Sequence, residues 1–525
     1  RAASGARAGG GSGRAAPAGI VLRHGVTRGM AATGTRTPQA VPDRAAAVAV
    51  GLTLALTVLL TAAAAVALPS IRLVAGITVS CLLAAVALRD ERQGLLATMV
   101  YLLFVAEIRR LLIPLVGWSS ADPLLLVGPA ILALLIVTIF VVGRRPLIPS
   151  GDRLTQMIAV LTVLALLSIV NPLAGGIAAG IGGLFYWAPQ LGWYFVGRSV
   201  VNDDTLARLL RLLVWCGTAI ALYGLWQAFV GHPPWDALWY QSAASTSLQV
   251  DDSVKPVGTF SSSFEYSTML AAALCTAVAL VLHGRKEMLL PLPVLFFALM
   301  TSGTRTSILF AFVGIAAVVA LKPREVRHAI LVGAVGLVAA LGGMLLVSSA
   351  LSSVLGGNAL VAHSSQGLSN PLDSNDSTFV LHMQIAWEGI KLGITHPTGL
   401  GIGATNQGGA ALTRDVTALR PAEIDLPNAF VALGIPGGLL YLAIIAFALF
   451  GVARLYFDGN DLALPALGVL MGGFGQWNTG GHYAMAPITF IVLAWVARGM
   501  TERRAHRTPD PHRPSGALAA ARRPS

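Results

Sequence analysis

Apolar residues form runs of about 20 that recur from residue 45 to residue 499, separated mostly by short polar connections. A run of that length can cross the hydrocarbon core of a bilayer as one helix. The sequence therefore predicts an all-α, polytopic membrane protein with about 12 to 14 transmembrane helices. The runs lie near residues 45–68, 70–88, 93–116, 123–143, 154–171, 176–197, 207–230, 258–282, 287–302, 305–321, 328–350, 428–452, 462–477 and 484–499.

The composition supports this class and changes how the charge is interpreted. Hydrophobic residues make up 55% of the 525 residues and charged residues only 11%, against about 25% in soluble proteins, which excludes an ordinary soluble enzyme. The net charge of +12 comes mainly from residues 1–44, with seven Arg and one Asp, and residues 501–525, with six Arg and two acids. Both segments are poor in large apolar residues, so we expect two disordered, basic cytoplasmic tails and no nucleic-acid partner.

Between the tails, basic residues indicate the topology. Cytoplasmic connections retain Lys and Arg, so an N-terminus on the inside also places the C-terminus inside. The long connection at residues 351–427 then lies outside, with six acids against three cations, and loops of this length are usually functional. Residues 378–392 within it predict a surface helix whose apolar face contains Phe379, Met383, Ala386 and Ile390. We divide the membrane region into residues 45–204 and residues 205–500, the second with this external loop.

Four pieces far apart in sequence fall on the outer side in this topology and at one depth. Two of them carry charges into the membrane boundary, because Lys255 and Glu265 flank the start of one span and Arg305 begins another. A charge there is costly unless it is paired or faces water. The four pieces are residues 255–266, 302–305, 396–403 and 425–438.

The order of motifs in roughly residues 205–499 resembles the O-antigen ligase and polymerase family of bacterial envelope proteins. The matching elements are Lys255 with Gly258-Thr259-Phe260, Thr304-Arg305, Pro397-Thr398-Gly399-Leu400-Gly401 with Gly403, and Pro427-Asn428 with Gly434-Ile435-Pro436-Gly437. Two elements of the family pattern are replaced: Pro427 stands where the family has His, and no Arg opens the loop helix, where His382 is the only possible cation.

This resemblance implies a glycosyltransferase that moves a glycan from an undecaprenyl-diphosphate carrier to a glycan or lipid acceptor at the outer face of the bacterial plasma membrane, without cofactor or metal. An Arg can bind the leaving diphosphate bidentately, and a carboxylate can accept the proton of the acceptor hydroxyl. The expected catalytic residues are Arg305, Asp425 and Glu265. The expected substrate-binding residues are Lys255, Arg414, Arg420, His396 and Asn428.

Structural roles compete with these assignments. Arg305 could anchor a helix end, Asp425 could cap the span that follows it, and Glu265 could lie at the headgroup level. Arg109 and Arg110 interrupt a span beside Glu107, which favours an internal ion pair over substrate contact. Aromatic residues of several spans are expected in interfacial belts, a usual place for such side chains: Trp187, Trp193, Tyr194, Trp235, Trp239 and Tyr240.

Two functions of other classes stay open at this stage. One is a transporter or flippase of a small anion or a lipid-linked sugar, which the missing family His favours slightly and for which broken spans in two corresponding halves would be expected. The other is a catalytically silent assembly protein of the cell envelope. The sequence does not distinguish a ligase from a polymerase, and it identifies neither donor glycan nor acceptor.

Overall fold

The structure is a computed structural model of the chain. It describes residues 71–120, 122–243, 248–250, 253–355, 358–369, 379–413, 424–478 and 482–507. The first predicted span at residues 45–68, the N-terminal tail and residues 508–525 lie outside the described residues. Residues 501–507, assigned to the second tail, continue the last helix instead.

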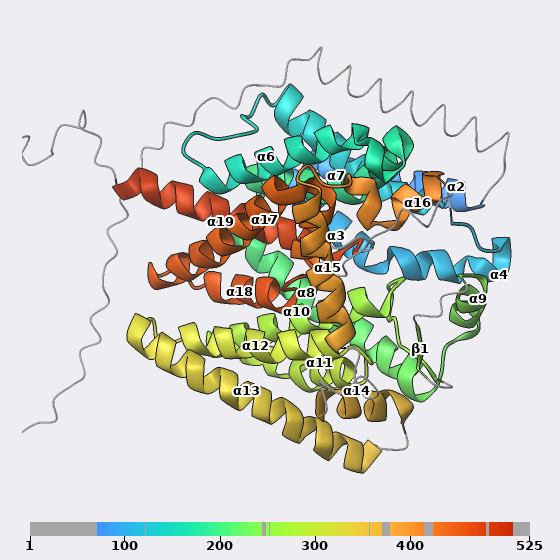
Figure 1. Cartoon of the computed structure of the whole chain (residues 1–525), viewed down its shortest axis with the longest axis vertical. Helices are drawn as coiled ribbons and strands as arrows, with labels where there is room; N and C mark the ends of the chain where they lie inside the picture. The colour runs from blue at the N-terminus through green and yellow to red at the C-terminus, as the bar shows by residue number, and fades with distance from the viewer. Residues whose placement is uncertain are drawn as a thin grey trace, which may run out of the picture.

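The described residues are mostly helical (Figure 1). The first half contains α2 (Ile71–Arg89), α3 (Glu91–Leu111), α4 (Ile113–Val116), η1 (Pro123–Leu126), α5 (Val127–Ile136), a π-helical turn η2 (Val137–Val142), α6 (Arg153–Leu167), η3 (Ser168–Val170), η4 (Pro172–Ala174), α7 (Gly176–Val200), α8 (Asp203–Phe229) and α9 (Pro234–Ala243). The second half contains α10 (Ser263–Leu282), η6 (Lys286–Leu289), α11 (Pro291–Met300), α12 (Arg305–Leu321), α13 (Val326–Leu355), α14 (Ala359–Ser369), α15 (Phe379–Thr395), η7 (Ile402–Thr405), α16 (Gln407–Thr413), α17 (Asp425–Phe457), α18 (Ala463–Gly472) and α19 (Met485–Arg507). Two short antiparallel strands, β1 (Gln249–Val250) and β2 (Ser253–Val254), pair Val250 with Ser253.

Seven helical segments in the described residues are long and apolar enough to cross a membrane: Ile71–Arg89, Pro123–Val142, Arg153–Val170, Asp203–Phe229, Ser263–Leu282, His328–Val347 and Asp425–Phe457. This confirms the all-α, multi-pass class. Helices α12 and α18 are apolar but shorter. The total of 12 to 14 spans and the external position of residues 351–427 stay predictions.

Helix α10 lies at the centre of the bundle and packs against α8, α11, α12 and α18. Small residues allow the closest approach. A Cβ on Gly468 of α18 would lie 2.8 Å from the backbone of Cys275 and Thr276. Small residues at helix contacts are the usual way in which membrane helices pack, because apolar burial gives little advantage inside lipid.

Helix α15 confirms a helix within residues 378–392, but its buried face differs from the expected one. Met383 is 49% exposed, whereas Ala386 and Gly393 are buried against α17. A Cβ on Gly393 would overlap the backbone of Phe430. Close backbone packing therefore decides which face is buried, and the larger apolar side chains point outward.

Helix α17 is broken at Gly434, whose φ of 66° and ψ of −157° are not helical. The segment after α15 fills the break. Leu400 N–H donates to Val431 O at 2.7 Å, Gly401 N–H donates to Ala432 O at 2.9 Å, and Ile435 N–H donates to Pro397 O at 3.2 Å. A break in a membrane helix needs such partners for its backbone groups. The two glycine-containing motifs of the sequence thus pair directly with each other.

Buried ion pairs connect the helices of the first half. Arg110, 1% exposed, pairs with Glu107, which confirms the expected internal ion pair, and its Nε also lies 2.9 Å from Asp236 Oδ1. Arg109 Nε lies 3.2 Å from Asp122, which also pairs with Arg72. The prediction of an interfacial belt is wrong for four of its aromatic residues, because their side chains are at most 4% exposed: Trp187, Trp193, Tyr194 and Trp239. Helix packing covers them.

Candidate functional site

The side chain of Lys255 packs against the turn that precedes α12, and Arg305 is the first residue of that helix. Gly303, in this turn, has a φ of 71°, and a Cβ there would lie 3.3 Å from Lys255 Cγ. A residue without a side chain is favoured at this position because it allows both the positive φ and the close approach. Arg305 Nη2 donates to the carbonyl of His363 at 2.7 Å and lies 3.3 Å from both ring nitrogens of that residue. The charge of Arg305 lies near enough to Lys255 to influence it.

The environment of Lys255 is unfavourable for its charge. The residue is half-buried, and within the part of the chain that the structure describes its Nζ makes no hydrogen bond or ion pair. Burial lowers the pKa of Lys255, and the neighbouring charge of Arg305 lowers it further. A cation in such a place is stabilised when an anion binds beside it.

The loop that carries Lys255 is fixed by buried polar contacts. Gln227 Oε1 accepts from Val257 N–H at 3.0 Å and from Gly258 N–H at 2.8 Å. Arg110 Nη1 donates to Phe260 O at 2.6 Å and Nη2 donates to Gly258 O. The ion pairs of α3 therefore position this loop as well as joining helices.

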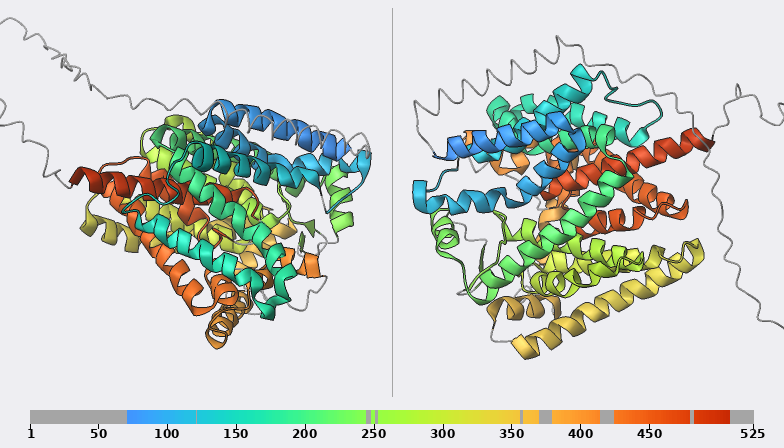
Figure 2. Two further views of the ribbon diagram at one scale, coloured as in Figure 1. Left: turned by 90° about the horizontal axis from the view of Figure 1, so that it is seen from above. Right: turned by 180° about the vertical axis from the view of Figure 1, so that it is seen from behind.

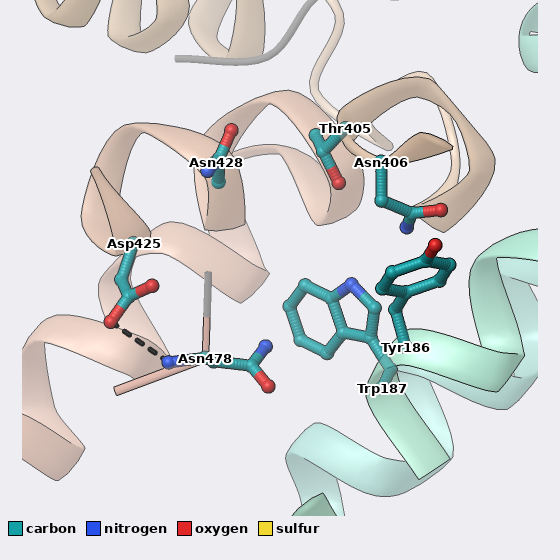
Figure 3. A pocket seen from close by; sticks show the side chains of 7 residues that line it. All are labelled: Tyr186, Trp187, Thr405, Asn406, Asp425, Asn428 and Asn478. Atoms are coloured by element: carbon teal, nitrogen blue, oxygen red, sulfur yellow. Dashed lines mark hydrogen bonds between the residues drawn. The ribbon is translucent and has the colours of Figure 1, made fainter. Parts of the chain in front are cut away.

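Asp425 lies at the start of α17 with only 3% of its surface exposed. Its Oδ2 accepts from the backbone N–H of Asn478 at 3.0 Å, as Figure 3 shows, and from the hydroxyl of Tyr441 at 3.0 Å. Its own N–H donates to Gly475 O at 2.9 Å. Asp425 therefore connects the start of α17 to the segment after α18. The N-cap position of α17 is held by Ile424, so the capping role considered for Asp425 is wrong. Its carboxylate instead binds groups outside the first turn of its own helix.

Beside Asp425 is a small cavity formed by amide and aromatic side chains (Figure 3). At about 10 Å³, it has room for one water molecule. Asn478 is 8% exposed and its Oδ1 has no partner among the described residues. Hydroxyl, amide and aromatic groups of this kind can bind the hydroxyls and apolar faces of sugars, although the cavity as it stands is too small for a sugar. Its walls are Tyr186, Trp187, Thr405, Asn406, Asp425, Asn428 and Asn478.

Close helix contact brings the aromatic wall to this place. A Cβ on Gly182 of α7 would overlap the carbonyl of Gly408 in α16, and one on Gly183 would lie 2.6 Å from Ile402 C. Tyr186 and Trp187 follow these glycines by one helical turn. The paired glycines are a partial signal for this contact in the sequence, although their partners are more than 200 residues away.

Glu265 has a structural position. Its Oε1 accepts from Ala484 N–H at 2.7 Å and from Met485 N–H at 3.3 Å, at the start of α19. The first N–H groups of a helix have no partner within the helix, and a carboxylate also matches the positive end of its dipole. Glu265 is 2% exposed, so its carboxylate faces the interior of the bundle and not lipid headgroups, and its depth in the membrane stays a prediction.

The remaining candidates are separate from this arrangement or outside the described residues. His396 directly follows α15, and its Nδ1 lies 3.1 Å from Leu392 O in the last turn of that helix. Asn428 lines the cavity beside Asp425. Arg414 and Arg420 lie outside the described residues. The described residues contain no group of three His, Cys, Asp or Glu side chains that could hold a metal ion.

One segment, residues 474–478, links the cation pair to the cavity. The ring of Phe474 lies 5.7 Å from that of Phe310 in α12, and Phe310 follows Arg305 by five residues, about 7.5 Å along a helix. Gly475 and Asn478 bind Asp425 from the same segment. Residues 474–478 therefore contact α12, which begins at Arg305, and the start of the 425–438 piece. The 396–403 piece pairs with residues 431–435 of that same piece.

A scan against protein-family models found no family that matches the chain, and a search of curated proteins found no match either.

Proposed function

We propose that this protein is a membrane glycosyltransferase that moves a glycan from an undecaprenyl-diphosphate donor to a hydroxyl of a glycan or lipid acceptor. Its proposed location is the outer face of a bacterial plasma membrane, with both termini in the cytoplasm. The observation that carries the proposal is a pair of neighbouring cations: Lys255 packs against the turn before Arg305 and is influenced by its charge, while Lys255 itself is half-buried and has no acidic partner among the described residues. Such a pair suits a diphosphate.

In the proposed reaction, the acceptor oxygen forms a bond to the anomeric carbon while the bond from that carbon to the diphosphate oxygen breaks. The leaving lipid diphosphate gains negative charge, which Arg305 and Lys255 stabilise. The acceptor hydroxyl loses its proton to a carboxylate, for which we propose Asp425. The atoms balance without a metal or a nucleotide sugar.

The cavity beside Asp425 supports the acceptor side of this scheme. Asn428 and Asn478 place amide groups next to the carboxylate, and Trp187 offers an aromatic face. The cavity has room for only about one water molecule, so sugar binding requires Asn478 and the segment around it to move. The proton that leaves the acceptor would go to the oxygen of Asp425 that faces the hydroxyl.

The test is transfer by purified protein in liposomes, with an undecaprenyl-diphosphate oligosaccharide as donor. We expect Arg305→Gln and Asp425→Asn to lower transfer at least 100-fold, about 2.7 kcal/mol of transition-state stabilisation. The matched control is Glu388→Gln, since Glu388 is exposed and pairs only with Lys391 in the described residues. Wild-type rates in both active-site variants would overturn the proposal.

One observation favours a transporter or flippase as the second candidate. Discontinuous membrane helices are typical of transporter binding sites, and α17 is discontinuous at Gly434. Liposomes that move a lipid-linked sugar or a small anion across the bilayer, with no glycosidic bond formed by any donor, would support this function over transfer. Loss of both activities in Arg305→Gln would mean that the two functions share the cation pair.

A further inference from the structure

A groove of about 520 Å³ opens between α3 and α8, with Val86 of α2 at its edge. The two helices contact each other directly on the back of the molecule (Figure 2, right). Val100 of α3 and Trp215 of α8 form part of its apolar wall, and Trp215 is 42% exposed. The volume is in the range of cavities that bind small molecules.

One end of this groove is cationic. Arg208 and Arg211 line it from successive turns of α8, and both side chains are exposed. Neither forms an ion pair with a described residue, and the Nε of Arg211 donates to Ala207 O at 3.2 Å. Gln93, near the start of α3, adds amide donors to the same groove. Three polar side chains with N–H donors thus face one opening.

The polar and apolar parts are separated along the helix axis. Trp215 follows Arg208 by seven residues, which is about 10.5 Å along α8, and Val100 follows Gln93 by the same number along α3. Both helices begin at the charged end of the groove. A ligand that fills it must therefore carry negative charge at one end and an apolar chain at the other.

We infer that this groove binds an anionic phospholipid, with the headgroup phosphate on Arg208 and Arg211 and an acyl chain along Val100 and Trp215. Arginines bind phosphate oxygens with paired N–H donors, and basic pockets between membrane helices are suited to acidic lipid headgroups. The volume of the groove accommodates part of a lipid, and the two arginines favour a negatively charged headgroup. This site is separate from the Lys255–Arg305 pair and does not depend on the proposed function.

The experiment compares lipids bound to the full-length protein after purification from liposomes that contain phosphatidylglycerol and phosphatidylcholine in equal amounts. Native mass spectrometry counts the retained lipids. We expect the wild type to retain phosphatidylglycerol at least 10-fold over phosphatidylcholine, and Arg208→Gln/Arg211→Gln to lose this preference. The matched control is Arg285→Gln/Lys286→Gln, which removes two exposed cations elsewhere and should keep it.

Two further arms distinguish the source of the phosphate and the role of the apolar wall. Inorganic phosphate at millimolar concentration should not displace the retained lipid, and Trp215→Ala should lower the retention of phosphatidylglycerol several-fold. Equal retention of both lipids by the wild type would overturn the inference. So would an unchanged preference in the double Arg variant, or displacement by phosphate alone.

Discussion

The backbone N–H of Ile435 donates to the carbonyl of Pro397 at 3.2 Å, across the break in α17. Gly434 and Gly399 make this contact possible, since both have a positive φ and each would overlap the opposite chain if it carried a Cβ. The start of α17, which carries Asp425, is thereby fixed separately from the rest of the helix. The break is therefore a structural device that orients the candidate site.

Replacing Gly434 by Ala should destabilise the protein strongly. The added Cβ would overlap Pro397 O and would lie 2.6 Å from Gly399 N, in addition to the strain of a φ of 66°. We expect a loss of more than about 3 kcal/mol, which combines left-handed strain with overpacking. Thermal unfolding in detergent measures it.

Gly459→Ala is the matched control for Gly434→Ala. Gly459 has a φ of 98°, but a Cβ there meets nothing within 4 Å. Its substitution should cost only about 1 to 2 kcal/mol, the backbone term alone. Equal losses in the two variants would show that packing against Pro397 contributes nothing.

Much of the fold follows from local sequence signals, and the site follows only in part. Apolar runs predict the helices because each run must satisfy its own backbone hydrogen bonds in lipid. The motifs at Gly399 and Gly434 were recognisable separately, but their pairing depends on backbone geometry that no spacing reveals. Asn478 and Trp187 were missed for the same reason, since their common cavity arises from helix packing between distant segments.

Lys255→Met should stabilise the protein while it weakens donor binding. The substitution removes a half-buried charge, and both burial and the charge of Arg305 lower the pKa of this lysine. The free energy of unfolding without donor should therefore rise by about 1 kcal/mol. Affinity for undecaprenyl diphosphate should fall at least 10-fold. Thermal unfolding with and without the lipid measures both effects. Lys391→Met, which removes an exposed cation 3.5 Å from Glu388, should change neither.

Arg110→Met should be among the most destabilising substitutions, apart from those of glycines at close helix contacts. It leaves Asp236 and Glu107 without their guanidinium partner and removes one donor from each of two carbonyls of the Lys255 loop. Breaking a buried pair in this way costs about 3 to 5 kcal/mol. Arg145→Met removes a partly exposed pair with Glu91 at 3.1 Å and should cost below about 1 kcal/mol. Chemical or thermal unfolding measures the loss of stability in both variants. Equal losses would contradict this expectation.

Tyr441→Phe should reveal the coupling between Tyr441 and Asp425. The variant removes a hydroxyl that donates to a buried carboxylate at 3.0 Å, which should cost about 1 to 3 kcal/mol. A double-mutant cycle with Asp425→Asn should give a coupling of about 1 to 2 kcal/mol. Tyr456→Phe is the matched control. The hydroxyl of Tyr456 donates to an uncharged acceptor, the carbonyl of Lys322, at 3.3 Å, so its removal should cost less. Additive losses for Tyr441 and Asp425 would exclude the coupling.

His482 should make the protein sensitive to mild acid. It lies in the connection before α19, 2% exposed, with its ring 5.9 Å from that of Phe264. Burial lowers its pKa to about 4 from 6.5, and a hydrogen bond with the backbone of Gln476 offsets only part of that effect. Between these two values the unfolded chain binds the proton and the folded chain does not, so stability rises with pH across this window. At pH 4 we expect a loss of about 3 kcal/mol relative to pH 7.

The His482→Gln variant should lose this part of the acid response while the rest of the pH profile stays the same. His328→Gln is the control, because His328 is exposed, and its substitution should leave most of the slope between pH 6.5 and pH 4 intact. Thermal unfolding in detergent at steps of pH measures both slopes. An unchanged slope in His482→Gln would mean that other groups, and not this imidazole, take up the protons on unfolding.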